Sequence, residues 1–200
     1  MAMFFILAFL LQICIRVLGK SSYDEYILAP SSRNLKPTLV YKVNGTVDNA
    51  AALTQYGTGN ATFHDYSMVT FDFGRNIGGL ASFEVLSVSG LDEEIGISFT
   101  ESSLWISPHG GDATHDSLID EIIWSNVTKP GRHTLEQRHD RGAFRYLNVY
   151  HRGSGTTTID SLDVHFSALP HNSEDQLRAY SGWFSSDDMK LNRVWYAGKS

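Results

Sequence analysis

Oxygen-bearing side chains are concentrated in residues 108–121, which read PHGGDATHDSLIDE. Carboxylate oxygens are the ligands that Ca²⁺ prefers, and Asp112, Asp116 and Asp120 therefore form a candidate Ca²⁺ site. Their spacing matches neither an EF-hand nor a zinc metallopeptidase motif. The alternative is a solvated loop that binds no metal, and the sequence predicts no other cofactor.

A carboxylate and two indoles flank this loop and could contact a sugar. Glu101 and Trp105 precede the loop, and Trp124 follows it. An indole offers an apolar face to the C–H groups of a pyranose, while its polar edge stays in water. The alternatives are a strand-end role for Glu101, bonded to loop amides, and burial between two sheets for Trp124.

The remaining acidic residues and histidines do not predict a catalytic site. Asp92, Glu93 and Glu94 follow Gly90 at an expected turn, where nothing would desolvate one carboxyl group and raise its pKa. None of the eight histidines has a serine or cysteine partner in a recognisable motif. We therefore assign no catalytic residue from the sequence.

Alternation of apolar and polar residues predicts the elements that position these side chains. In residues 94–100, Ile95, Ile97 and Phe99 share one face, which indicates a half-buried strand. Residues 161–166 alternate in the same way. Further strands are expected at residues 39–43, 68–73, 81–88, 121–124, 133–137, 144–151 and 177–184, separated by Gly, Asn, Asp and Ser. The sequence predicts an all-β fold, an antiparallel β-sandwich of concanavalin-like or jelly-roll type.

The first 19 residues predict a signal peptide. Residues 2–15 are almost entirely apolar, a run too short to span a bilayer comfortably, and Gly19 suits a cleavage site. An uncleaved anchor is the alternative. The only cysteine, Cys14, lies in this segment, so the chain after it holds no disulfide or thiolate site.

Three sequons support export from the cell. Asn44, Asn60 and Asn126 each stand two residues before a threonine with no intervening proline. We therefore predict a secreted, extracellular glycoprotein with no membrane contact once the signal is removed. The net charge of −6 gives no basic face for a phosphate backbone, which excludes nucleic acid as an expected partner.

The sequence suggests four regions after residue 19. Residues 20–66 are an extension or a partial β-domain, residues 67–168 a β-sandwich, residues 169–176 a linker, and residues 177–200 a final strand and a helix. Ser185 or Ser186 is the expected helix cap, and Leu191, Val194 and Trp195 form an apolar stripe. Such a stripe packs either on its own domain or on a downstream one.

Four segments carry a resemblance to a known family. They are residues 26–33 (YILAPSSR) with 40–45 (VYKVNG), residues 71–79 (FDFGRNIGG), residues 140–149 (DRGAFRYLNV) and residues 182–195 (GWFSSDDMKLNRVW). In this order they resemble the N-terminal portion of fungal α-L-rhamnosidase-like proteins of glycoside hydrolase family 78. Within residues 140–149 we expect Phe144 and Tyr146 to pack inward.

The resemblance implies that a non-catalytic β-sandwich precedes an (α/α)6 barrel whose first helix begins near Asp187. Catalysis by inversion would lie on that barrel, and no position of this chain matches its catalytic carboxylates. The implied partners are a rhamnose-containing glycoside or plant polysaccharide, bound by the parent enzyme, and the barrel itself, contacted within one chain. The alternative is a stand-alone secreted carbohydrate-binding β-sandwich.

Overall fold

The computed structural model describes residues 24–111 and 121–198. Two compact units divide them. One unit holds residues 32–171, and the other joins residues 24–31 to residues 172–198. The predicted signal peptide (residues 1–19) and the candidate Ca²⁺ ligands Asp112, Asp116 and Asp120 lie outside the described residues. No helix among the described residues has the length and apolar character of a membrane span.

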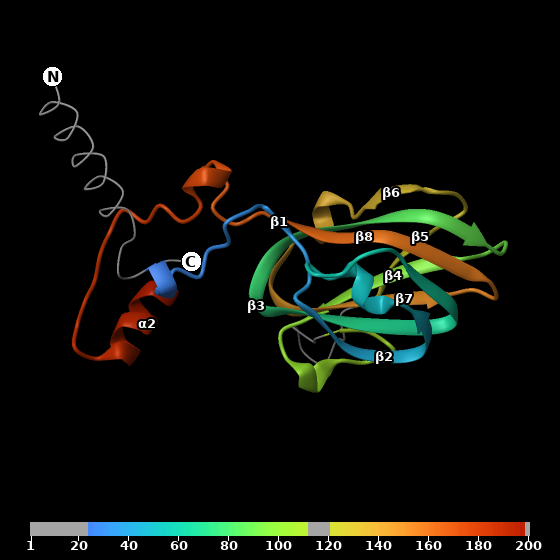
Figure 1. Ribbon diagram of the computed structural model, residues 1–200, viewed down its shortest axis with the longest axis horizontal. Coiled ribbons are helices and arrows are strands. Elements are labelled where there is room, and N and C mark those ends of the chain that lie inside the picture. Colours follow the sequence, from blue (N-terminus) through green and yellow to red (C-terminus); the bar gives the residue numbers. More distant parts are fainter. Residues whose placement is uncertain (1–23, 112–120, 199–200) are drawn as a thin grey trace, which may run out of the picture. The chain divides into compact units, whose positions relative to one another are not determined.

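Residues 32–171 form an antiparallel β-structure (Figure 1). Its main strand order is β1-β8-β3-β7-β4-β5, and β2 and β6 each pair with β3. The strands are β1 (Asn34–Leu35), β2 (Leu39–Asp48), β3 (Ala61–Ser89), β4 (Glu94–Thr100), β5 (Ile123–Asn126), β6 (Gly131–Thr134), β7 (Arg141–Arg152) and β8 (Thr156–Phe166). Short 3-10 helices are η2 (Ala50–Leu53), η3 (Ser103–Trp105) and η4 (Gln137–His139).

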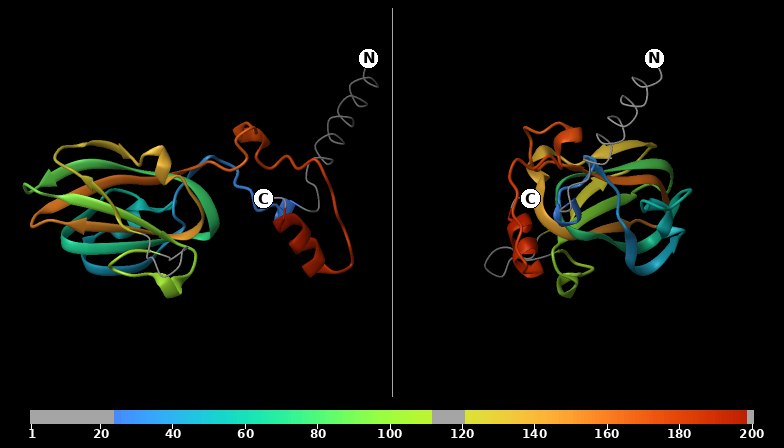
Figure 2. Two further views of the ribbon diagram at one scale, coloured as in Figure 1. Left: turned by 180° about the vertical axis from the view of Figure 1, so that it is seen from behind. Right: turned by 60° about the vertical axis from the view of Figure 1, so that its left-hand side comes forward.

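The long strand β3 belongs to both layers of this unit (Figure 2). Residues 61–72 pair with β2, β7 and β8, and residues 79–89 pair with β6 and β8. The corner between the two parts needs glycine. Gly74 has a φ of +76°, and a Cβ on Gly79 would lie 2.1 Å from the carbonyl oxygen of His165. The segment 71–79 therefore folds the sheet back on itself.

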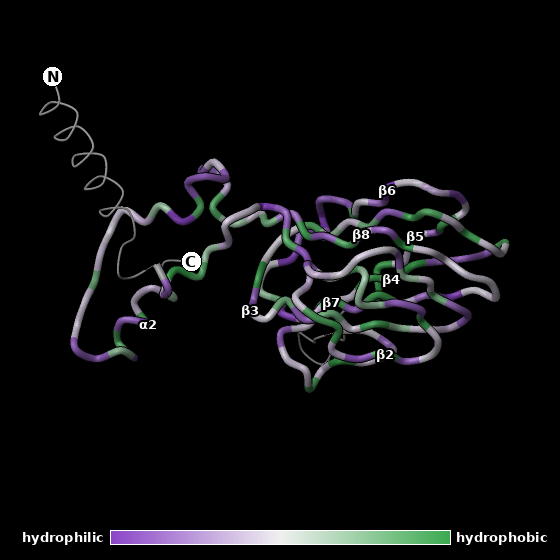
Figure 3. The backbone as a smooth tube through the Cα atoms, in the orientation of Figure 1, coloured by the Kyte–Doolittle hydropathy of each residue, from purple (hydrophilic) through white to green (hydrophobic). Residues whose placement is uncertain are grey.

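The hydrophobic core fills the space between the layers. Ile95, Ile97 and Phe99 all belong to it, as the alternation in residues 94–100 predicts. Phe63, Phe71, Phe83, Leu147, Leu162 and Val164 join them and are almost fully buried. Hydropathy changes repeatedly along these strands (Figure 3), as expected where one face is buried. The predicted all-β antiparallel sandwich is confirmed.

The expectation that Phe144 and Tyr146 pack inward together is half wrong. Phe144 lies in the core against Phe73, with the ring centroids 5.9 Å apart. Tyr146 is also buried, at 6% exposure, but it lies outside the core cluster, on the face of the sheet that carries Asp72, where it packs against Tyr41. The β3–β7 pairing is irregular here, because its register shifts between the pair formed by Tyr146 and the pair formed by Phe144.

Three expected strands differ from the structure. The strand expected at residues 133–137 is β6, displaced to Gly131–Thr134, and Gln137 belongs to η4. The strand expected at residues 121–124 is β5, displaced to Ile123–Asn126. The strand expected at residues 177–184 is absent from that described segment, and the 3-10 helix η5 (Glu174–Gln176) precedes it. Gly182 and Ser185 flank two adjacent aromatic residues, so apolar and polar side chains do not alternate regularly in this segment.

The predicted division at residue 66 falls inside β3. Residues 34–66 supply β1, β2 and the start of β3 to the sandwich, so they are neither an extension nor a separate partial domain. Their irregular pattern follows from edge positions: β2 is exposed over much of its length, so few of its side chains must be apolar. The boundary between the two units, after residue 171, lies within the predicted linker.

The smaller unit is built around three tyrosines. Tyr196 of α2 (Met189–Ala197) stacks with Tyr26 of η1 (Asp24–Tyr26) and with Tyr180, with ring centroids 5.6 and 6.3 Å apart. Arg178 adds hydrogen bonds from its guanidinium to the carbonyl oxygens of Ile27 and Ala29. Segments far apart in the sequence are thereby joined.

The structure changes the predicted cap of α2 and shows how far its predicted apolar stripe is covered. Asp188, rather than Ser185 or Ser186, caps the helix by accepting hydrogen bonds from the amides of residues 190 and 191. Leu191 and Val194 are exposed, while Trp195 stacks on Phe184 at 5.9 Å. The stripe is thus only partly covered within its own unit.

Candidate functional site

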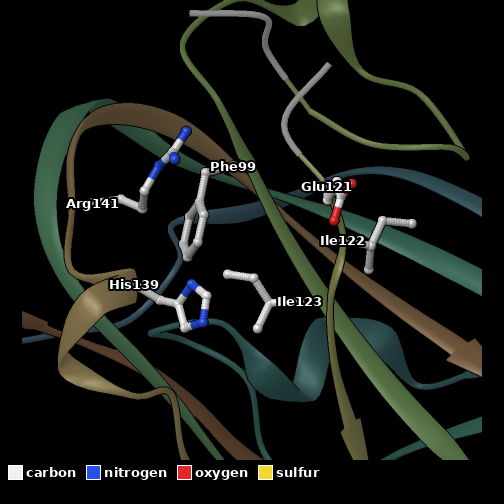
Figure 4. A pocket seen from close by; sticks show the side chains of 6 residues that line it. All are labelled: Phe99, Glu121, Ile122, Ile123, His139 and Arg141. Atoms are coloured by element: carbon white, nitrogen blue, oxygen red, sulfur yellow. The ribbon is translucent and has the colours of Figure 1, made fainter. Parts of the chain in front are cut away.

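A pocket of about 240 Å³ opens at one end of strands β4, β5 and β7 (Figure 4). Phe99, from the end of β4, and Ile123, from the start of β5, are its apolar part. His139 of η4 lies next to both in Figure 4. Arg141 of β7 and the segment Glu121–Ile122 complete the lining.

Strand alternation and packing fix the ring of Phe99. Its ring centroid lies 4.6 Å from that of Phe144, at an interplanar angle of 51°. Both rings belong to the core, so Phe99 joins the core to the pocket. Phe99 is only 4% exposed, so its ring forms the floor of the pocket, and its fixed position costs no side-chain ordering when a ligand binds.

Polar groups reach the pocket from the turn before β7. Arg138 donates a hydrogen bond from Nε to Nε2 of His139 at 3.3 Å. The carboxylate of Asp140 accepts hydrogen bonds from Gln137 at 3.1 Å and from Ser167 at 2.9 Å. These contacts hold the turn and so position Arg141 at the start of β7.

The pocket therefore combines an aromatic surface with donors and an acceptor. Arg141 supplies guanidinium donors, His139 supplies a ring donor, and Glu121 supplies a carboxylate. Within residues 24–111 and 121–198 no group of three His, Cys, Asp or Glu side chains could hold a metal ion. Apolar walls with a few oriented polar groups are typical of small-molecule binding sites.

The three sequence-predicted sugar contacts lie outside this lining. Glu101 and Trp105 are exposed, with Trp105 in η3 and 57% accessible. Trp124 is half-buried, with its six-membered ring against Gly96 and the guanidinium of Arg152 4.1 Å from the ring centroid. A sugar would have to displace Arg152 to stack on that face. Sugar contact by all three residues stays a prediction.

The three sequons differ in accessibility. Asn60 and Asn126 are exposed, as a glycan acceptor must be. Asn44 is half-buried on β2, and its amide nitrogen lies 3.9 Å from the sulfur of Met68. Glycosylation of all three stays a prediction, and Asn44 is the least accessible of them.

Sequence reasoning missed a buried polar ladder across β3, β7 and β4. Thr70 donates to the side-chain oxygen of Asn148 at 2.7 Å, and the Asn148 amide donates to Ser98 at 3.0 Å. The hydroxyl of Ser98 lies 2.9 Å from that of Tyr150, which donates to the carbonyl oxygen of Ser107 at 2.7 Å. The loop after η3 covers the ladder, and only its carbonyl groups close the network.

Burial and hydrogen bonding affect Tyr150 in opposite directions. Burial raises the pKa of Tyr150, the hydrogen bond with Ser98 lowers it by less, and the result is about 12. The phenol therefore stays protonated and remains a donor to the covering loop across the physiological range.

A second buried polar group is the pair Glu93 and His151. The expectation that nothing desolvates the carboxyl groups of residues 92–94 is wrong for Glu93, which is 1% exposed because the turns around it fold over its side chain. Nε2 of His151 lies 2.8 Å from a Glu93 carboxylate oxygen, and both side chains are almost fully buried. The amide of Gly155 donates to the other oxygen at 2.9 Å. A Cβ at Gly90, Gly153 or Gly155 would collide with this carboxylate. Glu93 and His151 are residue types that could serve acid–base catalysis. Both side chains are buried, so a substrate has no space beside them, and the pair holds the surrounding turns together.

Comparisons with known proteins give structural neighbours only. No family model and no curated protein matches this chain. A solved structure of the CBM32 module of AlyQ, in complex with 4,5-unsaturated mannuronic acid, is 11% identical with a TM-score of 0.41, over 66% of this chain and 98% of that one. A fucose-binding module of Streptococcus pneumoniae is 10% identical with a TM-score of 0.40, over 67% and 96%.

A rhamnosidase from Klebsiella oxytoca with rhamnose bound is also similar. It is 18% identical with a TM-score of 0.45, over 72% of this chain but 31% of the enzyme. The TM-scores of these alignments are low, so the fold described above is defined by its own strand pairing and core.

Proposed function

We propose that this chain is the non-catalytic, carbohydrate-binding β-sandwich region of a secreted α-L-rhamnosidase-like glycoside hydrolase. The observation that carries the proposal is the pocket beside Phe99, which places an aromatic ring near Arg141, His139 and Glu121. A pyranose has an apolar C–H face and a rim of hydroxyl groups, and these two kinds of surface correspond to the two parts of the pocket.

The size and the charges of the pocket support binding of a single sugar unit. Its volume of about 240 Å³ is below the roughly 300–1,000 Å³ of pockets for drug-sized ligands. Arg141 and Glu121 bring opposite charges to one lining. Hydroxyl groups act as both donors and acceptors and can satisfy both, whereas an anionic or a cationic ligand would be repelled by one of them.

A non-catalytic role is supported by the carboxylate at the site. Inverting hydrolysis needs two carboxyl groups on opposite sides of the sugar, about 6.5–9.5 Å apart. Glu121 is the carboxylate among the residues that line the pocket. Among the residues that the structure describes, the lining thus has one half of the required acid and base, which favours binding over hydrolysis.

The rhamnoside substrate and the secretion of the parent enzyme rest on the sequence. The segments 71–79 and 140–149 that carry the family resemblance form the corner of β3 and the start of β7, where they shape the same end of the sandwich as the pocket. In this proposal the exposed stripe of Leu191 and Val194 contacts the helical barrel of the parent enzyme.

A stand-alone carbohydrate-binding sandwich is the second candidate. The observation that favours it is that every residue of the pocket lies within the unit 32–171. Binding by the pocket would then need no other domain. Under both candidates, the affinity of the sandwich for sugar does not depend on a downstream barrel. The candidates differ in hydrolysis, which the first candidate assigns to the barrel and the second does not include.

The test is calorimetric titration of the full chain with methyl α-L-rhamnopyranoside. We expect Arg141→Gln and His139→Ala each to weaken binding about tenfold, the loss of roughly one charge-assisted hydrogen bond. Arg132→Gln is the matched control, because Arg132 pairs with Asp163 on β8, away from the pocket lining. Unchanged affinity in both pocket variants, with the fold intact, would refute the pocket as the binding site.

A further inference from the structure

A second cluster on the sandwich has an arginine with a fixed orientation. Asp72 of β3 is only 4% accessible and accepts two hydrogen bonds from Arg145, from Nε and Nη2, both at 2.8 Å. The amide of Gly74 donates to the same carboxylate at 2.6 Å. Two parallel bonds to a buried carboxylate hold the guanidinium plane in one orientation.

One edge of this guanidinium remains for another molecule. Arg145 uses Nε and Nη2 for Asp72, and among the described residues Nη1 has no hydrogen-bond partner. The side chain of Arg145 is 41% exposed, so part of it is open to solvent. The bonds from Nε and Nη2 to Asp72 are enough to fix the guanidinium of Arg145. They leave the two N–H donors of Nη1 pointing in a defined direction.

Two tyrosine rings form a wall beside this donor edge. Cζ of Arg145 lies 5.3 Å from the ring centroid of Tyr146, and Tyr146 packs edge to face with Tyr41 at 5.1 Å. Tyr41 is 48% exposed. Tyr146 is only 6% exposed and supports Tyr41 from behind, so Tyr41 is the ring that faces solvent next to donors whose direction is already set.

Two backbone irregularities place these side chains. A register shift between Val40 and Lys42 in the β2–β3 pairing leaves Tyr41 as the extra residue of a bulge, and bulges redirect side chains. Ala143 has a φ of +56°, a left-handed conformation that costs a non-glycine residue about 1 kcal/mol. It precedes the register shift that separates Phe144 in the core from Tyr146 on the outer face.

We propose that Tyr41, supported by the buried ring of Tyr146, and Nη1 of Arg145 form a second carbohydrate subsite that takes a neutral pyranose. Its C–H face would pack on Tyr41, and two adjacent hydroxyl oxygens would accept hydrogen bonds from Nη1. This inference rests on the proposed function in one respect only, that the domain binds carbohydrate. It places a second contact on β2 and β7, with no residue shared with the pocket.

The charge balance selects a neutral sugar over a uronate. Asp72 already neutralises Arg145, so the pair has no net charge with which to attract a ligand carboxylate. The Asp72 oxygens are occupied by three donors, so the cluster offers donors and an aromatic face. Hydroxyl oxygens need only such donors, whereas a carboxylate would pay its full desolvation cost without a free positive charge in return.

Nuclear magnetic resonance of the full chain tests this subsite. The probes are methyl α-L-rhamnopyranoside and methyl β-D-glucuronide, and the signals are the ring protons of Tyr41 and the guanidinium group of Arg145. We expect the neutral glycoside to shift both signals, and Tyr41→Ala to weaken binding at this subsite about fivefold to tenfold. Tyr56→Ala is the matched control, because Tyr56 is 83% exposed and lies in another part of the unit.

The variant Arg141→Gln separates this inference from the pocket. If the Tyr41 and Arg145 signals still shift in that variant with unchanged affinity, the subsite stands whether or not the pocket binds sugar. Two results would overturn it: no shift of these signals at concentrations that saturate the pocket, or stronger binding of the glucuronide than of the neutral glycoside. Arg145→Lys, which keeps a positive charge for Asp72 but lacks Nη1, should weaken binding like Tyr41→Ala while the protein stays folded.

Discussion

Two polar clusters lie side by side on the outer face of β3 and β7, and they differ in whether their hydrogen-bonding groups are sealed from solvent. Thr70 pairs with Asn148 in the ladder, and two residues further along, Asp72 pairs with Tyr146 in the arginine–tyrosine cluster. The ladder is sealed under a loop and each of its members bonds to another. The other cluster keeps Nη1 of Arg145 and the ring of Tyr41 open to solvent.

The difference shows how one fold can use some polar groups for stability and keep others available for a ligand. A buried polar group contributes to stability only when every donor and acceptor is paired, and the ladder meets that condition through loop carbonyl groups. A binding site must instead leave an oriented group unpaired at the surface. We therefore expect substitutions in the ladder to change stability, and substitutions at the open edge to change binding.

Asn148→Ala should have the largest effect of these variants. It removes the central residue of the ladder and leaves Thr70 and Ser98 as buried hydroxyl groups without their partner. We expect the free energy of unfolding to fall by about 3 kcal/mol, measured by urea denaturation. Asn126→Ala is the control, since Asn126 is exposed, and should change it by less than about 0.5 kcal/mol. An equal loss in both variants would contradict the account of the ladder.

Tyr150→Phe should have a smaller effect, because it removes one hydroxyl group and keeps the ring. We expect a loss of about 2 kcal/mol, since the Ser107 carbonyl loses its donor. The pKa of Tyr150 is raised to about 12, so the phenol stabilises the fold fully below the unfolded value near 10 and this contribution is lost as pH rises through 12. Unfolding curves of the wild type and the variant should therefore converge over that alkaline range.

Asp72→Asn should change how the free energy of unfolding depends on pH in the acidic range. Burial would raise the pKa of Asp72, but the hydrogen bonds from Arg145 and Gly74 and the charge of Arg145 outweigh it, so the pKa is lowered from 3.8. A depressed pKa gives stability above the unfolded value that is lost as pH falls through the folded value. We expect a cost of about 1 kcal/mol at neutral pH, since Arg145 is partly exposed, and a smaller difference in strong acid. A pH-independent difference would contradict this ion pair.

Tyr41→Ala should have the smallest effect on stability and a clear effect on binding. The ring is half exposed at a bulge, so we expect the free energy of unfolding to change by less than about 1 kcal/mol. Thermal unfolding of this variant and of Tyr56→Ala provides the measurement. A loss as large as that of Asn148→Ala would place Tyr41 with the ladder, as a structural residue.

Much of the sandwich could be predicted from the sequence, because strict alternation needs only a buried face. The inward set of Ile95, Ile97 and Phe99 is an example. The outer face of the same strand could not be predicted: Ser98 and Thr100 are buried, since a distant loop covers them, and alternation does not show what lies above a polar face. Tyr146 is buried outside the core rather than in it, because the register shift beside it depends on pairing with β3.

The candidate pocket was less predictable than the fold. Phe99, Glu121 and Arg141 come from three separate segments that only the β4, β5 and β7 pairing brings together. Each residue type alone is common at strand ends. The nearest available signal was the polar stretch 108–121, whose last residue, Glu121, does line the pocket. The predicted contact Trp105 precedes this stretch, in η3, and lies outside the lining.

Carbohydrate binding by the sandwich is tested most directly by a crystal structure of the full chain with methyl α-L-rhamnopyranoside. The account predicts a pyranose in the pocket, with its C–H face on the apolar part formed by Phe99 and Ile123 and its hydroxyl groups within hydrogen-bond distance of Arg141 or His139. An empty pocket at sugar concentrations of roughly 10 mM, above the millimolar affinities of weak ligands, would contradict it.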